Sequence, residues 1–174
     1  AFYEKIKVPP PTWCPECRMM RRFLFRNQRH LFRRKDDASG QDIFGSFPQA
    51  ASVKVYEHDY WWSDKWDPMD YGKNYDFSRS FLEQFRDLLY SVPLFSKSIQ
   101  KMVNSDYCDQ SGFLKNCYLC FDTGFGENSA YIVTGVELKD CFDIYQSTHD
   151  ELCYDSVMID EGYKNFFSID CDNN

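Results

Sequence analysis

Hydrophobic and polar positions recur every twelve residues over the C-terminal third of the chain, from Leu114 to Cys171. Each copy holds a small or polar residue, then in most copies an aromatic residue, and three positions later an apolar residue. Such self-similarity is typical of a solenoid, in which each unit buries its apolar face against its neighbours. β-Branched and aromatic residues broken by Gly, Asn and Asp predict a strand and a turn per unit, and hence a β-solenoid. The small or polar column comprises Cys117, Ser129, Cys141, Cys153 and Asn165.

The charges two positions before this column alternate in sign, through Lys115, Glu127, Lys139 and Glu151. A coil of twelve residues would stack opposite charges, whereas a coil of twice that length would stack like charges. The pattern therefore favours short coils, although surface charge pairs contribute little energy. A chance pattern within an ordinary β domain is the alternative.

A helix is predicted over residues 76–92, where Phe77, Phe81 and Phe85 form an apolar stripe. Ser80 and Glu83 match a capping box, Pro93 ends the helix, and we expect the helix to cover the open end of the solenoid. The fold class is thus α+β, with a zinc-knuckle and helical head followed by a short-repeat β-solenoid. The expected domains are a basic head (1–54), an aromatic hub with the capping helix (55–107) and the Cys-rich repeats (108–174).

Charge is distributed unevenly along the chain. Residues 1–54 contain 11 Lys and Arg against 5 Asp and Glu, whereas residues 55–174 contain 9 against 22. Five arginines in the basic part recur at steps of three or four, which predicts one helical stripe within residues 18–35. Guanidinium groups in a stripe suit phosphate contacts, and ion pairs with the acidic body of the same chain are the alternative. The five arginines are Arg18, Arg22, Arg26, Arg29 and Arg33.

Eight cysteines are present, six of them from Cys108 onward. Stacked reduced thiols behave as small hydrophobic groups, so a cytoplasmic protein without disulfides is expected. A disulfide-stapled extracellular or cell-surface solenoid is the alternative. No apolar run reaches membrane-spanning length, and no signal peptide is visible. Because the chain begins with Ala1 and stops at Asn174 on the beat of a repeat, we expect it to be part of a longer protein.

The segment Cys14-Pro15-Glu16-Cys17 is typical of a zinc knuckle, in which backbone amides turn toward two thiolates. A structural zinc ion needs four ligands, and this chain contains only one such pair, so the predicted zinc site is incomplete. Two unligated cysteines in a turn, or a redox pair, are the alternatives.

Several motifs together resemble one family, a group of uncharacterised zinc-ribbon proteins of candidate-phyla bacteria that often carry a CoA-transferase family label. The resemblance covers nearly the whole chain, and the tryptophan motif is its most specific part. The motifs are Phe2-Tyr3-Glu4-Lys5-Ile6, Val8-Pro9-Pro10-Pro11-Thr12, Cys14-Pro15-Glu16-Cys17-Arg18, Arg26-Asn27, Trp61-Trp62-Ser63-Asp64-Lys65-Trp66-Asp67-Pro68-Met69-Asp70-Tyr71-Gly72, Asp76-Phe77-Ser78-Arg79 and Leu114-Lys115-Asn116-Cys117-Tyr118.

The resemblance implies a second Cys-x-x-Cys pair upstream of the position matching Phe2, which would complete a ribbon with Cys14 and Cys17. Many members have a cysteine where this chain has Asp36, and some have cysteines at Glu57 and Tyr60. Asp36 and His58 are therefore weaker candidate ligands for a second metal cluster. The resemblance implies no activity.

His58 is the one histidine beside both acids and aromatic residues, and no Gly-rich phosphate loop, nucleophile elbow or paired-His metal motif accompanies it. We therefore expect a protein that is not an enzyme. Trp61, Trp62 and Trp66 are expected to form a packed hub, with stacking on bases or sugars as the alternative.

These features predict a non-enzymatic binding protein. Its basic head, with zinc at Cys14 and Cys17, would engage nucleic acid or another anionic partner, while the acidic solenoid serves as a rigid body. The alternative is a structural protein, a filament or cell-surface element, that self-associates through the open ends of its solenoid.

Overall fold

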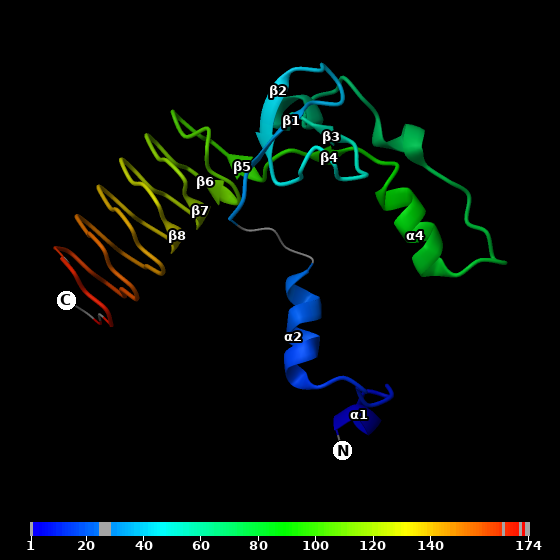
Figure 1. Ribbon diagram of the computed structural model, residues 1–174, viewed down its shortest axis with the longest axis horizontal. Helices are drawn as coiled ribbons and strands as arrows, with labels where there is room; N and C mark the ends of the chain where they lie inside the picture. The colour runs from blue at the N-terminus through cyan, green and yellow to red at the C-terminus, as the bar shows by residue number, and fades with distance from the viewer. Residues whose placement is uncertain (1, 25–28, 165, 171, 173–174) are drawn as a thin grey trace.

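The computed structural model describes residues 2–24, 29–164, 166–170 and 172. Two helices come first and stand apart from the rest, and a middle region joins them to a stack of turns that ends at the C-terminus (Figure 1). The helices are α1 (Phe2–Lys5), α2 (Pro15–Phe23), α3 (His58–Trp61), the 3-10 helix η1 (Pro68–Tyr71) and α4 (Phe81–Leu89). The strands are β1 (Phe32–Lys35), β2 (Asp42–Gly45), β3 (Val55–Tyr56), β4 (Leu94–Phe95), β5 (Ile99–Gln100), β6 (Ser111–Gly112), β7 (Phe121–Thr123) and β8 (Val133–Gly135).

The predicted β-solenoid is wrong. The strands form four separate two-stranded sheets, β1-β2, β3-β4, β5-β6 and β7-β8, none of which closes or continues as the wall of a solenoid. Only β1-β2 is antiparallel, with Phe32 opposite Gly45. Among the described residues the last strand ends at Gly135, although the sequence pattern continues far beyond it. The fold is mixed α/β with few helices.

Backbone conformation explains why the strands stay short. Left-handed residues occur at every third position over much of the repeat, with φ between 50° and 62° from Asn116 through Tyr131. Each one turns the chain after about two extended residues, so a long strand cannot form. The twelve-residue spacing survives as isolated parallel bridges, such as Tyr118 to Ala130 to Phe142. Successive turns therefore lie over one another in Figure 1 without a continuous sheet.

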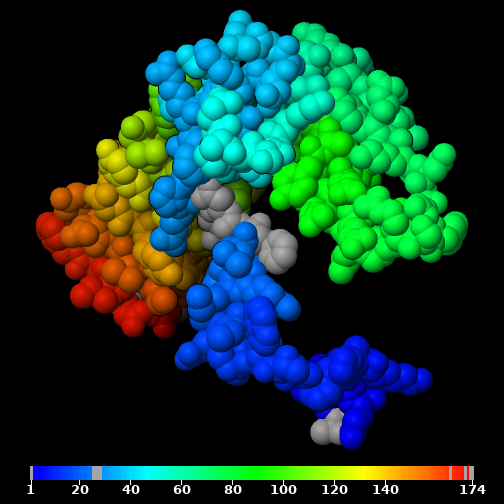
Figure 2. Space-filling view, turned by 45° about the vertical axis from the view of Figure 1, so that its right-hand side comes forward, coloured from blue at the N-terminus to red at the C-terminus, as the bar shows by residue number. Residues whose placement is uncertain are grey.

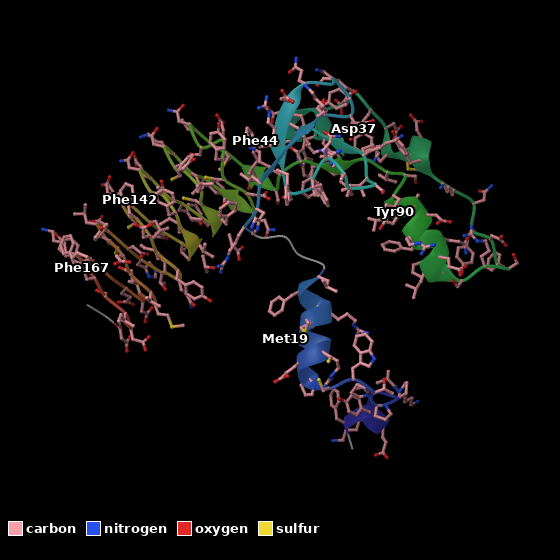
Figure 3. The ribbon with its side chains drawn as sticks, viewed as in Figure 1. Met19, Asp37, Phe44, Tyr90, Phe142 and Phe167 are labelled. Carbon is pink, nitrogen blue, oxygen red and sulfur yellow. The ribbon has the colours of Figure 1, made fainter. Side chains whose placement is uncertain are left out.

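A second period of three residues governs burial in the stack. Every third residue from Ser105 to Gly162 is buried, and the two residues between are mostly exposed. Leu114, Ile132 and Leu138 make up much of the apolar interior, together with the cysteines. Most aromatic residues of the stack point outward instead, as Phe142 and Phe167 do in Figure 3, whereas Phe121 is buried.

The tryptophan segment packs in the middle region. Trp61 donates from Nε1 to the Pro93 carbonyl at 2.8 Å, and Trp66 donates from Nε1 to the Trp61 carbonyl at 2.7 Å. The Trp61 ring also meets Phe95 edge to face, with centroids 5.2 Å apart. Trp62, in contrast, is 68% exposed. Trp61 and Trp66 are half-buried, and each satisfies its ring N–H with a backbone carbonyl.

The helix expected over residues 76–92 is the shorter α4. Its N-cap is Ser80, whose side chain accepts from the Glu83 N–H at 3.4 Å, so this half of the predicted capping box is present. The expected capping of the repeat is wrong, because α4 lies on the side of the middle region away from the stack (Figure 1). No helix among the described residues is long and apolar enough to cross a membrane.

Candidate functional site

Cys14 and Cys17 lie at the start of α2, on the exposed surface of the head. Cys14 is the N-cap of the helix, and its Sγ accepts from the Cys17 N–H at 3.3 Å. This hydrogen bond lowers the pKa of the Cys14 thiol below its usual value. Pro15 fits the first helical position because it has no N–H to satisfy there. Among the described residues, no third cysteine, histidine or carboxylate lies close enough to the pair to share a metal ion with it.

The predicted single helical stripe of arginines is wrong. Arg18 and Arg22 lie on α2, but that helix ends at Phe23 and Arg33 lies in strand β1. Arg33 pairs with Asp42 at 2.8 Å, and Arg29 stands over the Tyr145 ring at 5.6 Å. The remaining member, Arg26, lies outside the described residues. The helical spacing of these arginines therefore does not place them on one face.

The Asp36 carboxylate is hydrogen-bonded within the protein. Its carboxylate accepts from the Ser39 N–H at 2.7 Å, the Ser39 hydroxyl at 2.5 Å and the Glu57 N–H at 3.0 Å. Burial of Asp36 raises its pKa, but these hydrogen bonds more than offset that effect and leave the pKa below its usual value. The carboxylate closes the turn between β1 and β2 and ties it to the start of α3.

His58, the other weaker metal candidate, donates from Nδ1 to the Lys97 carbonyl at 3.0 Å. It lines a hollow of about 1080 Å³ between the middle region and the first turns of the stack, together with Trp62, Gln100 and Asp109. The buried Asp109 carboxylate accepts from the Ser98 N–H at 2.8 Å and from the Ser46 hydroxyl. These bonds fasten the middle region to the stack.

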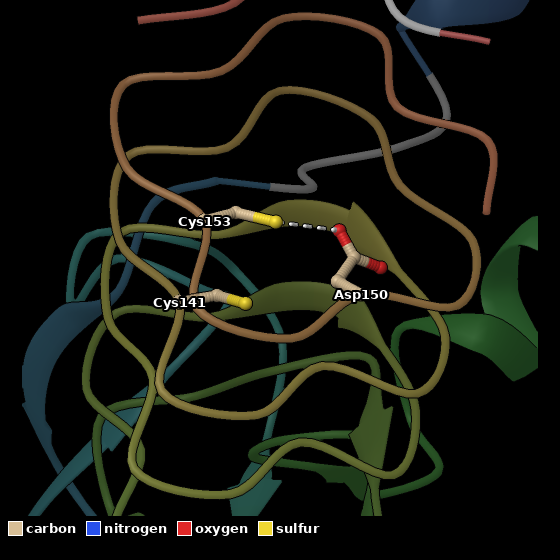
Figure 4. Close-up of side chains that lie close together, drawn as sticks. All are labelled: Cys141, Asp150 and Cys153. Atoms are coloured by element: carbon tan, nitrogen blue, oxygen red, sulfur yellow. Dashed lines mark hydrogen bonds between the residues drawn. The ribbon is translucent and has the colours of Figure 1, made fainter. Parts of the chain in front are cut away.

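Cys141, Asp150 and Cys153 meet inside the stack (Figure 4). Their ligand atoms all lie within 4.8 Å of one another, and the three residues are 0%, 2% and 2% exposed. The group could hold a metal ion. Asp150 accepts from the Ser147 hydroxyl, from the Thr148 N–H at 3.2 Å and from the Cys153 thiol at 3.9 Å.

Burial raises the pKa of Asp150, because the charged carboxylate loses its hydration. Hydrogen bonding with Cys153 lowers the pKa of Cys141, so this thiol forms its thiolate more readily than usual. Two sulfur atoms and one carboxylate thus lie close together in the buried interior.

The metal candidates expected from sequence did not include this group. The cysteine column at twelve-residue spacing was visible, but it indicated hydrophobic packing. Asp150 stands three residues before Cys153, and a three-residue period of burial places both inside the stack. The three-residue period of burial is the signal that would have brought Asp150 and Cys153 together in the prediction. It only becomes clear once the left-handed corners are known.

A second group of thiols lies nearer the start of the stack. Cys120 makes thiol contacts with both Cys108 and Cys117, and hydrogen bonding with Cys120 lowers the pKa of Cys117 to about 7. All three residues are buried, and none of the described cysteines forms a disulfide.

Comparison with known proteins adds no relative: no family model, no curated protein and no solved structure matches the chain. The resemblance to zinc-ribbon proteins stays a prediction.

Proposed function

We propose that this chain is a non-enzymatic binding protein that engages an anionic partner, with nucleic acid as the first candidate. The binding part is residues 2–24, which are called the head from here on in place of the wider range 1–54 expected from the sequence. The position of α2 carries the proposal. The helix projects from the remaining surface in Figure 2, and its arginines Arg21 and Arg22 are exposed. A projecting basic helix can reach the phosphates of a partner without displacing other parts of the protein.

The charge of the head supports the same conclusion. Residues 2–24 contain five basic side chains, Lys5, Lys7, Arg18, Arg21 and Arg22, against the acidic Glu4 and Glu16. Apolar side chains on the same helix are also exposed, among them Met20 and Phe23, both at 66%. A partner that contacts both sets would bury apolar area and neutralise charge together.

Zinc is the proposed metal for the head. Cys14 and Cys17 supply two thiolates at the helix start, and the family resemblance predicts a second cysteine pair to complete the site. Binding of zinc would compensate the charge of the thiolates and leave the arginines of α2 as the dominant charge of the head.

The test is a filter-binding titration of duplex DNA and single-stranded RNA across salt concentrations. Three phosphate contacts, by Arg18, Arg21 and Arg22, should give a slope of about −3 in log affinity against log salt on duplex DNA. An Arg18→Gln/Arg22→Gln double variant should reduce the magnitude of that slope by about 2. Arg33→Gln is the matched control, because Arg33 already pairs with Asp42, and it should leave binding unchanged. A flat salt profile would contradict the proposal.

A self-assembling structural role is the second candidate. One bridged column contains Ala130, which is buried, and four aromatic residues, which lie on the outside of the stack and are 42–63% exposed: Tyr118, Phe142, Tyr154 and Phe166. Aligned exposed aromatic residues favour association between copies. Light scattering over a concentration series tests this role, since a mass that stays at 20.7 kDa rules it out.

A further inference from the structure

We propose that Cys141, Asp150 and Cys153 supply three ligands of a buried site for a thiophilic divalent cation, of which zinc is the natural example. The bound ion fastens two neighbouring turns of the stack to each other. The site is separate from the head and does not rest on the function proposed above.

The backbone holds the two sulfur atoms in place from adjacent turns. Cys141 and Cys153 are twelve residues apart, and the Phe142 N–H donates to the Cys153 carbonyl at 3.1 Å. On the other side of the pair, the Leu152 N–H donates to the Lys139 carbonyl at 3.0 Å. An ion between the thiolates would therefore join turns that already have a fixed register, so binding the ion costs little conformational entropy.

Asp150 breaks the chemistry of its own column. The equivalent positions in other turns are apolar or carry no side chain, namely Leu114, Gly126, Leu138 and Gly162. Burying a carboxylate in place of leucine costs free energy unless a positive charge compensates it. Among the described residues, no lysine, arginine or histidine forms a salt bridge with Asp150. A divalent cation held by the two cysteines, which release their protons when they bind it, would give the carboxylate a positive partner to coordinate in place of its lost hydration.

The donor set selects the kind of ion. Two thiolates and one carboxylate suit zinc, cadmium or cobalt, whereas magnesium and calcium require oxygen ligands throughout. The Ser147 hydroxyl donates to Asp150 and orients the carboxylate from behind. Among the residues that the structure describes, no carboxylate joins the other thiol group, Cys108, Cys117 and Cys120, which therefore provides an internal comparison.

The experiment is a cobalt titration of the whole chain carrying Cys14→Ser and Cys17→Ser, which removes the head as a competing site. Cobalt should produce thiolate-to-metal charge-transfer absorption at one equivalent, and zinc should displace it and raise the thermal unfolding midpoint. Cys141→Ser should abolish the absorption.

Serine is a mild substitution in this column. Ser129 occupies the preceding turn, where its Oγ donates to the Glu127 carbonyl at 2.8 Å as Cys141 Sγ donates to the Lys139 carbonyl. Cys117→Ser, in the same column but outside the site, is the matched control and should keep one equivalent of cobalt.

Asp150→Leu provides a second variant that restores the leucine seen at position 138. Without metal its unfolding midpoint should equal or exceed that of the parent, because a buried charge is removed, and zinc should no longer raise it. Full cobalt absorption in Cys141→Ser, or an undiminished zinc response in Asp150→Leu, would overturn the proposal.

A measurement on the unsubstituted chain covers the case in which these variants fail to fold. Zinc should slow alkylation of Cys141 and Cys153 under mild denaturant far more than it slows alkylation of Cys117. Equal protection at all three cysteines would overturn the site.

Discussion

Small polar side chains inside the stack act as hydrogen-bond partners for the backbone of the next turn. The Cys117 N–H donates to the Ser105 hydroxyl at 3.0 Å, the Cys120 N–H to the Cys108 sulfur at 3.4 Å, and the Cys141 N–H to the Ser129 hydroxyl at 3.1 Å. A buried N–H without a partner is costly, so these positions need a side chain that is both small and able to accept. Serine and cysteine therefore share one column, which comprises Ser105, Cys117, Ser129, Cys141 and Cys153.

Asp36 illustrates a charged residue used in the same way. Asp36 is 2% exposed, and its carboxylate accepts from two backbone N–H groups and one hydroxyl around the turn between β1 and β2. Both carboxylate oxygens therefore accept hydrogen bonds that stabilise this turn.

We predict that Asp36→Asn lowers the free energy of unfolding at neutral pH by about 1–3 kcal/mol, since the amide cannot accept at both ends. The folded pKa of Asp36 lies below its usual value, so its contribution is present above the unfolded pKa of about 3.9. It is lost as pH falls through the folded pKa. Denaturant titrations of parent and variant across pH should therefore converge in acid. A constant difference at all pH values would contradict the assignment.

At the scale of the element, one corner of the stack is built from a column of amides. Asn104 donates to Asn116 at 3.1 Å, Asn116 to Asn128 at 3.0 Å, and Asn128 to Asp140 at 3.1 Å. The last four members, from Asn116 to Leu152, have φ between 50° and 58°. Asparagine tolerates this left-handed conformation, whereas leucine does not adopt it readily. Leu152 is the exception in its column.

We expect Leu152→Asn to stabilise the protein by about 1 kcal/mol, because it relieves left-handed strain and adds a donor to Asp140. Leu152 is 42% exposed, so little apolar burial is lost. Asn128→Leu is the matched reverse change and should destabilise, because it breaks two links of the column. Thermal unfolding of both variants provides the measurement, and equal effects of the two would refute the explanation.

Across the whole molecule, the basic N-terminal third does not act as one surface. Arg34 is 3% exposed and pairs with Asp37 at 2.9 Å, and Asp37 also accepts from the Val55 N–H at 2.7 Å. These bonds join the β1-β2 hairpin to β3 in the middle region. Arg34 therefore does not contribute to a basic surface. The basic side chains proposed to contact a partner are those of residues 2–24, which project from the rest of the molecule in Figure 2.

Arg34→Ala should destabilise the whole protein by about 3 kcal/mol, because it leaves the Asp37 carboxylate without its ion-pair partner. Arg33→Ala is the control one residue away, where the paired side chains are 70% and 44% exposed, and its cost should stay below about 1 kcal/mol. Equilibrium unfolding in urea measures both. Similar costs for the two variants would show that Arg34 is not the link between the hairpin and β3.

The structure agrees with the sequence signals where residues close together in the chain decide the local structure. Ser80 caps α4 as predicted, because the contact lies within one helical turn. Cys14 and Pro15 start α2 for the same local reason, although the sequence was interpreted there as a zinc-knuckle turn. The arginine spacing failed for the opposite reason. Arg33 lies in the β1-β2 hairpin, where it pairs with Asp42, a residue nine positions later in the sequence. That tertiary pairing outweighs the helical periodicity of the arginines.

The sequence by itself determined that residues twelve positions apart lie side by side in successive turns, because the repeated columns have that spacing and the parallel bridges join the same positions. Only the tertiary structure decided that these residues build stacked corners and short separate sheets rather than a β-solenoid. The conformation of each corner depends on contacts with the turns above and below. The same stacking brought Cys141, Asp150 and Cys153 together, since their proximity arises from two turns lying face to face.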